Sequence, residues 1–149
     1  DMAVNLKSTF LCTKGVIEPM KRRGGGVIIN ASSFAAQIPS VGQSVYAAAK
    51  SGVKSFTRVS AAELAPYNIR TFAYIPGVIK TQLVAPLIED PQNAERMKND
   101  IAAHRFGEPS EVASVVVFLA SERAGYVSGT SIEVAGGKFC VQNPGKIYE

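Results

Sequence analysis

The sequence has few of the residues on which metal sites and nucleophilic triads depend. Its 149 residues include one histidine and two cysteines. Cys12 and Cys140 lack the spacing of a metal site or of a disulfide framework, which is typical of a protein from a reducing compartment. A Ser-His-Asp triad would have to use His104, and no G-x-S-x-G turn accompanies it. The carboxylates are dispersed, so they form no paired acid-base site.

Long hydrophobic runs and runs of one charge are also absent. No apolar run approaches the roughly 20 residues that a membrane span requires, and residues 1–7 lack the charged-then-apolar order of a secretory signal. The formal net charge is +4. The one basic cluster, Lys21–Arg23, follows a helical pattern, which favours a helix C-terminus over a nucleic-acid site. We therefore expect a cytoplasmic protein with neither a membrane nor a nucleic acid as its partner.

Alternating patterns of apolar residues predict an α/β fold. Apolar residues three and four apart predict a helix from Ala3 to about Arg22, which a glycine at position 24 ends. Short β-branched runs predict buried parallel strands. The alternation predicts right-handed βαβ units with helices on both faces of a parallel sheet. The remaining expected elements are a strand at 26–31, a loop at 32–43, a helix at 44–65, a strand at 69–75, a broken helix at 80–104, a helix beginning near Pro109 and a strand at 131–135.

Tyr46 and Lys50 form the first candidate for chemistry. They lie four positions apart on the second expected helix, so their side chains share one face. An ammonium within a few ångströms lowers the pKa of a phenol and makes it a usable acid-base group. Alone, such a pair is as typical of a solvated helix face.

Ser33 is the second candidate. It follows the C-terminal end of the strand at 26–31, and ligands bind at the carboxyl ends of strands in open α/β sheets. A hydroxyl there could bind a substrate oxygen while Tyr46 passes a proton. The alternative is a loop serine that hydrogen-bonds its own backbone.

Taken together, these motifs resemble the short-chain dehydrogenase/reductase family. Its signature matches Tyr46-Ala47-Ala48-Ala49-Lys50, with Ser33 upstream at the end of a strand and Asn5 in the first helix. Residues 75–81, Ile-Pro-Gly-Val-Ile-Lys-Thr, resemble the loop that holds the nicotinamide. The resemblance continues at 105–111, 126–129 and 136–137 and so covers nearly the whole chain, and it includes members like the 3-oxoacyl-carrier-protein reductases.

The resemblance implies roles for individual residues, with NAD or NADP as cofactor. Tyr46 would be the general acid and base. Lys50 would assist it and bind the nicotinamide ribose, and Ser33 would polarise the substrate oxygen. The implied catalytic residues are Asn5, Ser33, Tyr46 and Lys50; the implied cofactor-binding residues are Tyr46, Lys50, Pro76, Gly77, Ile79 and Thr81; the implied substrate-binding residues are Ser33, Phe34, Gln37, Gln43 and Tyr46.

The family's glycine-rich phosphate-binding turn has no counterpart in the sequence. Gly24–Gly26 precede a strand instead of following one, and Gly136-Gly137 have no helix behind them. Three expected strands also fall short of a doubly wound sheet. We therefore expect residues 1–149 to be the C-terminal portion of one NAD(P)-binding Rossmann domain, with the N-terminal strands absent, about 100 residues missing before Asp1, and little activity in the isolated chain.

The expected function is interconversion of a secondary alcohol and a ketone. Apolar residues between positions 80 and 104 favour a moderately hydrophobic small-molecule carbonyl substrate. The family resemblance implies a 3-oxoacyl-thioester reductase first, and an enzyme that acts on a sugar, a steroid or a simple secondary alcohol remains open. Small residues on the two long helices favour a homo-oligomer, a dimer or a tetramer. The alternative is a non-catalytic interaction module that has kept the family motif.

Overall fold

The computed structural model describes residues 1–149, which form two compact units. The first unit comprises Asp1–Ile75 and Val116–Ile132, and the second comprises Pro76–Val115 and Glu133–Glu149. Each unit has its own cluster of buried apolar side chains. None of the helices combines the length and the hydrophobicity that crossing a bilayer requires.

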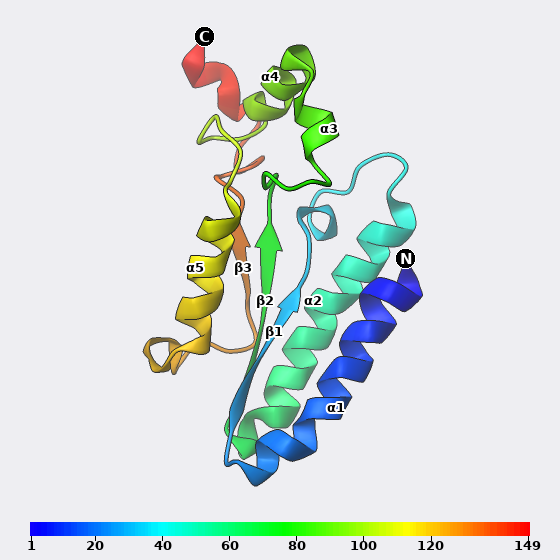
Figure 1. Cartoon of the computed structure of the whole chain (residues 1–149), viewed down its shortest axis with the longest axis vertical. Coiled ribbons are helices and arrows are strands. Elements are labelled where there is room, and N and C mark those ends of the chain that lie inside the picture. Colours follow the sequence, from blue (N-terminus) through cyan, green and yellow to red (C-terminus); the bar gives the residue numbers. More distant parts are fainter. The chain divides into compact units, whose positions relative to one another are not determined.

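A three-stranded parallel sheet forms the centre of the first unit (Figure 1). Its strands are β1 (Gly26–Ala31), β2 (Ile69–Pro76) and β3 (Ser131–Val134), in the order β1-β2-β3. β1 and β2 are parallel, with Gly26 opposite Ile69 and Ala31 opposite Tyr74. The sheet confirms the predicted α/β fold, because parallel strands require helical crossovers between them.

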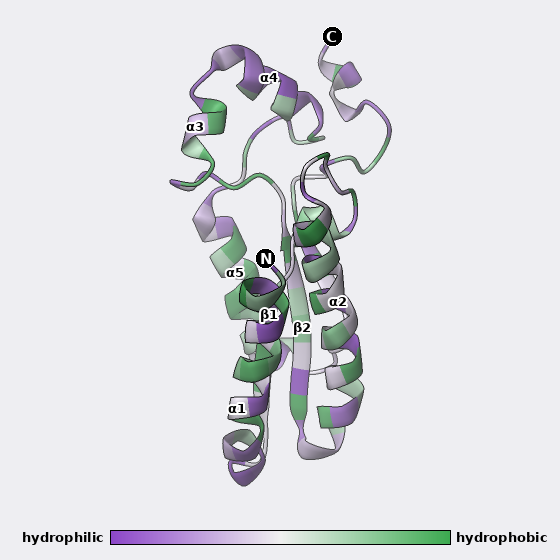
Figure 2. Cartoon of the chain, turned by 90° about the vertical axis from the view of Figure 1, so that its right-hand side faces the viewer, coloured by the Kyte–Doolittle hydropathy of each residue, from purple (hydrophilic) through white to green (hydrophobic).

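Two long helices, α1 (Ser8–Arg22) and α2 (Ser44–Leu64), lie side by side on one face of this sheet (Figure 1). The C-terminal half of α5 (Pro109–Ala120) lies on the other face. α1 ends where Gly24 adopts a φ of 80°, the left-handed conformation that glycine takes at helix ends. Figure 2 shows hydrophobic and hydrophilic bands along both α1 and α2, as amphipathic helices on a sheet require.

Charged and apolar residues of β2 both contribute to the core. Phe72 is fully buried at the middle of the strand. The guanidinium of Arg70 donates three hydrogen bonds of 2.7–3.1 Å to carbonyls that follow or end α5. Arg70 therefore supplies donors to carbonyl groups that a helix end leaves unpaired. The three carbonyls belong to Leu119, Ser121 and Ala124.

Two short helices of the second unit, α3 (Ala85–Ile88) and α4 (Pro91–Asn99), take the place of the predicted broken helix. Pro86 and Pro91 each lie in the first turn of a helix, where a missing N–H costs nothing. The prolines therefore begin these helices as well as separating them. α4 is largely hydrophilic (Figure 2), and the core beneath it consists of Ala94, Ile101 and Phe106.

Thr71 offers a test of the packing of β2. Its hydroxyl is buried without a hydrogen-bond partner, which is unfavourable in an apolar environment. We expect Thr71→Val to raise the free energy of unfolding by about 1 kcal/mol, measured by urea denaturation, because the methyl group fills the same space without an unpaired dipole. The matched control is Thr57→Val, since the Thr57 hydroxyl is equally buried but accepts from Asn30 and donates to Val53. That variant should lose about 1–2 kcal/mol; a loss of similar size in both variants would refute the interpretation of Thr71.

Candidate active site

Lys50 lies at the centre of the candidate proton-transfer site in the first unit. Its Nζ donates a hydrogen bond of 2.9 Å to the carbonyl of Ala31, at the C-terminal end of β1. The same ammonium lies 5.7 Å from the centre of the Tyr46 ring. The predicted pair therefore shares one face of α2, with the lysine directed to the carboxyl end of a strand.

The electrostatic state of Lys50 is unusual for a lysine near the surface. No carboxylate forms an ion pair with it, and partial burial lowers the pKa of its ammonium by desolvation. An ammonium that no carboxylate neutralises exerts its full field on the nearest ionisable group. Within the first unit, this ammonium lies over the aromatic ring of Tyr46.

A second tyrosine and lysine in the same unit provide a comparison. Lys21 lies 4.0 Å from the centre of the Tyr67 ring, closer than Lys50 lies to Tyr46. However, Lys21 pairs with Glu18 at 3.0 Å, and the hydrogen bond that Lys21 donates to this carboxylate raises the pKa of Lys21. The two pairs thus differ in one respect: a carboxylate neutralises the charge of Lys21, whereas Lys50 has no carboxylate partner.

Backbone contacts lock α2 to the end of β1. The buried hydroxyl of Ser32 donates to the backbone carbonyl of Lys50 at 3.0 Å, and the amide of Ser32 donates to the carbonyl of Tyr74 in β2 at 3.0 Å. The Ser32 hydroxyl thus fixes the backbone of Lys50, and the Lys50 side chain binds the carbonyl of Ala31. Ser32 was not among the predicted site residues, because a serine next to Ser33 carries no distinguishing signal.

Ser33 caps a short 3-10 turn at Phe34–Ala36, and its hydroxyl oxygen accepts from the amide of Ala35 at 3.2 Å. The alternative interpretation of Ser33, a loop serine that hydrogen-bonds its own backbone, predicted this bond. The bond uses an oxygen lone pair, so the hydroxyl proton remains available for donation to a substrate oxygen. Ser33 can therefore satisfy its own backbone and still polarise a carbonyl.

The other predicted substrate-binding residues differ in exposure. Phe34 is buried, with 8% of its surface exposed. Gln37 is exposed, and its Oε1 accepts from Lys54 at 3.2 Å. Gln43 is the exposed residue at the start of α2. The two glutamines are accessible to a ligand, whereas Phe34 is largely shielded from solvent.

Asn5 lies in a π-helical segment, Met2–Lys7, that leads into α1. Its side chain donates to the carbonyl of Asp1 at 3.2 Å, and its own carbonyl accepts from the hydroxyl of Thr9 at 2.8 Å. π-Helical turns are rare and occur often at functional sites. This segment packs against α2, the helix that carries Tyr46 and Lys50.

The second unit contains the segment Pro76–Thr81, which was predicted to contact the nicotinamide. Ile79 forms a parallel bridge with Gly107, in which the amide of Lys80 donates to the carbonyl of Gly107 and the amide of Gly107 donates to the carbonyl of Val78, both at 2.9 Å. In such a bridge the N–H and C=O of the central residue point away from the partner. The backbone donor and acceptor of Ile79 have no partner in the structure, so they could bind a primary carboxamide.

Gly77 and Thr81 flank Ile79. A Cβ atom on Gly77 would come within 2.8 Å of the backbone of Ala135, so the close approach that requires glycine here is with Ala135. The hydroxyl of Thr81 is exposed and makes no hydrogen bond within the chain. It therefore remains available for a ligand oxygen, such as one of a phosphate.

The chain matches a known protein family over most of its length. The family model described as enoyl-(acyl carrier protein) reductase matches residues 1–138. That match includes both the lysine–tyrosine pair and the Pro76–Thr81 segment. The chain belongs to the short-chain dehydrogenase/reductase family.

Several members of the short-chain dehydrogenase/reductase family are similar over most of this chain. Human dehydrogenase/reductase SDR family member 4 is 42% identical over 134 residues, which cover 90% of this chain and 48% of the relative. The 3-oxoacyl-[acyl-carrier-protein] reductase of Aquifex aeolicus is 42% identical over 138 residues, covering 93% and 55%. The chain therefore spans about half the length of the curated relatives that it matches.

A solved structure confirms the predicted fold class. A crystal structure from Agrobacterium tumefaciens, whose name proposes 2-deoxy-d-gluconate 3-dehydrogenase activity, superimposes with a TM-score of 0.90 at 32% identity. The alignment covers 94% of this chain and 57% of that one, which contains bound NADP. The short-chain dehydrogenase/reductase chain described here thus has part of the doubly wound Rossmann fold, as the sequence predicted.

Proposed function

We propose that the protein containing this chain is an NAD(P)-dependent oxidoreductase that interconverts a secondary alcohol and a ketone. The observation that carries the proposal is the partly desolvated ammonium of Lys50, which lies 5.7 Å from the Tyr46 ring and has no carboxylate partner. Membership of a family whose relatives are named dehydrogenases or reductases supports the same activity.

In this proposal Tyr46 donates the proton that a ketone oxygen requires when it becomes an alcohol. The dinucleotide, when bound, supplies the hydride that the carbonyl carbon receives. Lys50 favours the phenolate that Tyr46 becomes, because a positive charge stabilises a neighbouring negative one. Ser33 donates a hydrogen bond to the same oxygen, and Asn5 holds the water through which Lys50 returns a proton to Tyr46. The reverse direction uses the phenolate as a base.

The backbone of Ile79 and the hydroxyl of Thr81 fit the nicotinamide side of a dinucleotide. An unpaired N–H and C=O on one residue complement the two polar groups of a carboxamide, and the hydroxyl offers a donor for a phosphate. We propose that Lys50 and Tyr46 bind the nicotinamide ribose and that Pro76 and Gly77 shape the backbone before Ile79. Both NAD and NADP satisfy these contacts, because they share the nicotinamide half.

The proposed substrate is a moderately hydrophobic small carbonyl compound, with 3-oxoacyl thioesters first. The segment that follows the nicotinamide-binding residues exposes Leu83 (86%) and Leu87 (52%), which suit an apolar substrate. Relatives with 40–42% identity include enzymes named for 3-oxoacyl and 3-hydroxyacyl substrates. Ser33, Phe34, Gln37, Gln43 and Tyr46 would form the polar end of this substrate site.

We propose a homo-oligomer, a dimer or a tetramer, in the cytoplasm, and exposed apolar residues on the two long helices support the oligomer. Phe10 and Leu11 on α1 are 47% and 51% exposed, and Val59 on α2 is 57% exposed. Exposed apolar patches of this kind are typical of surfaces that bind another protein. Size-exclusion chromatography with light scattering would distinguish a homo-oligomer from a monomer.

The test of the proposed activity is oxidation of NADH or NADPH by the protein that contains this chain. We expect turnover with a 3-oxoacyl thioester or another ketone from a panel that includes cyclic ketones, steroids and keto sugars. The 149-residue chain alone should not turn over, because it lacks a phosphate-binding turn after a strand. The alternative, a non-catalytic interaction module, would show no oxidation with any ketone although it binds a protein partner.

A further inference from the structure

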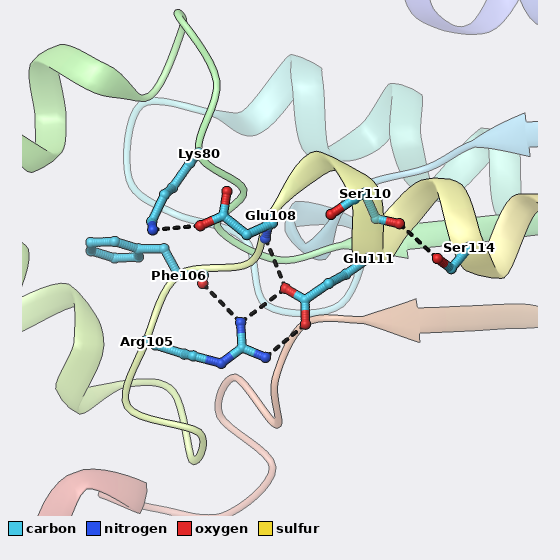
Figure 3. Close-up of polar contacts among 7 residues, drawn as sticks. All are labelled: Lys80, Arg105, Phe106, Glu108, Ser110, Glu111 and Ser114. Atoms are coloured by element: carbon cyan, nitrogen blue, oxygen red, sulfur yellow. Dashed lines mark hydrogen bonds and ion pairs between the residues drawn. The ribbon is translucent and has the colours of Figure 1, made fainter.

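An ion pair in the second unit lies directly beside the proposed nicotinamide-binding segment (Figure 3). The guanidinium of Arg105 makes two hydrogen bonds to Glu111, from its two terminal nitrogens to the two carboxylate oxygens at 2.9 and 2.7 Å. Such bidentate pairs fix geometry more strictly than a single contact does. Arg105 also donates to the carbonyl of Phe106 at 3.2 Å, so the guanidinium binds both Glu111 and the backbone next to Gly107.

Glu111 has a second task at the start of α5. One of its carboxylate oxygens accepts from the backbone amide of Glu108 at 2.8 Å, the residue before the helix. This is the backward half of a capping box. The hydrogen bonds from Arg105 and from the Glu108 amide lower the pKa of Glu111 from 4.5 to about 2. The carboxylate therefore stays charged, and the contacts stay formed, throughout the pH range in which enzymes are assayed.

Gly107 lies between these two contacts and is the partner of Ile79. Arg105 and Phe106 fix the chain before Gly107, and the cap on Glu108 fixes it after. The two backbone bonds of Gly107 hold Val78 and Lys80, so Ile79 is held from both sides. A further ion pair joins Lys80 Nζ to Glu108 at 2.5 Å, across the same bridge.

We propose that Arg105 and Glu111 are positioning residues that orient the backbone N–H and C=O of Ile79 toward the nicotinamide carboxamide. They act through Gly107 and do not contact the reacting atoms themselves. The inference rests on the proposed function for the role of Ile79, but the mechanical link from Glu111 to Ile79 consists of contacts within one unit.

The test is Glu111→Gln in the protein that contains this chain. Glutamine retains an oxygen for the Glu108 amide, so α5 keeps its cap and the fold is retained, but the bidentate charge pair is lost. We expect the KM for the dinucleotide to rise about tenfold while the KM for the ketone changes by less than about threefold, because only the cofactor segment moves. Arg105→Met should give the same pattern, and the double variant should be no worse than either single variant.

Hydrogen exchange separates failure of this inference from failure of the proposed function. The amides of Lys80 and Gly107 should exchange faster in Glu111→Gln, whether or not the protein turns over a ketone. The matched control, Glu18→Gln, breaks the Lys21–Glu18 pair in the other unit and should change neither exchange rate nor dinucleotide KM. Unchanged exchange in Glu111→Gln, or faster exchange with an unchanged dinucleotide KM in an active enzyme, would overturn the inference. An inactive wild type with faster exchange in the variant would refute the proposed function and, with it, the cofactor role of Arg105 and Glu111.

Discussion

Tyr46→Phe is expected to lower kcat for ketone reduction by about 10³-fold or more while the dissociation constant for the dinucleotide rises by less than about tenfold, because Lys50 keeps its proposed contact with the ribose. The substitution removes only the phenolic oxygen, which is the group proposed to give the proton. The ring remains, so its position beside Lys50 and the packing of α2 are retained. Steady-state kinetics would measure kcat, and calorimetry would measure dinucleotide binding to both proteins.

Tyr67→Phe is the matched control for this variant. Tyr67 also has a lysine over its ring, Lys21 at 4.0 Å, but that lysine is neutralised by Glu18. We expect its kcat to equal that of the wild type. Undiminished activity in Tyr46→Phe would remove Tyr46 from the reaction, and an equal loss in both variants would indicate a general effect of tyrosine loss on the fold.

Lys50→Met is expected to lower kcat by about 10²-fold and to weaken dinucleotide binding, because the ammonium serves both the phenolate and the ribose in the proposed mechanism. Methionine retains the length and apolar stem of lysine. The variant loses the hydrogen bond to the Ala31 carbonyl but also the desolvation cost that lowers the pKa of Lys50. Its free energy of unfolding should therefore change by less than about 1 kcal/mol.

The pH dependence of stability that Lys50 contributes has the opposite sign to that contributed by an ordinary ion-paired lysine. Because burial lowers its pKa in the folded state, the folded protein binds fewer protons at this residue than the unfolded protein. The wild type should therefore gain stability from this residue as the pH rises toward the ordinary lysine pKa of 10.5. Lys50→Met should lose that pH dependence.

Much of the fold and of the candidate site could be predicted from the sequence, because apolar residues recur with a regular spacing and Tyr46 and Lys50 form a recognisable motif. The strands at 26–31 and 69–75 and the helix at 44–65 match β1, β2 and α2 closely, because buried strands and amphipathic helices have distinct patterns. The i, i+4 spacing of Tyr46 and Lys50 was enough to place them on one face. The roles of these residues remain proposals.

Contacts between residues distant in sequence could not be predicted. Nothing in the sequence indicates that Lys50 donates to the carbonyl of Ala31 or that Ser32 binds the Lys50 backbone. Similarly, an arginine in an apolar strand predicts burial with partners, but not that Arg70 would bind carbonyls beyond α5. The capping role of Glu111 did have a local signal, since Glu108 and Glu111 have the spacing of a capping box.

The most direct test of the central claim follows the hydrogen atoms through the reaction. The protein that contains this chain is supplied with a ketone and with NADH or NADPH that carries deuterium at the transferred position, and the product is analysed by mass spectrometry. We expect an alcohol with a single deuterium on the former carbonyl carbon, formed by the wild type and not by Tyr46→Phe. Product without deuterium, or labelled alcohol formed equally well by Tyr46→Phe, would contradict it.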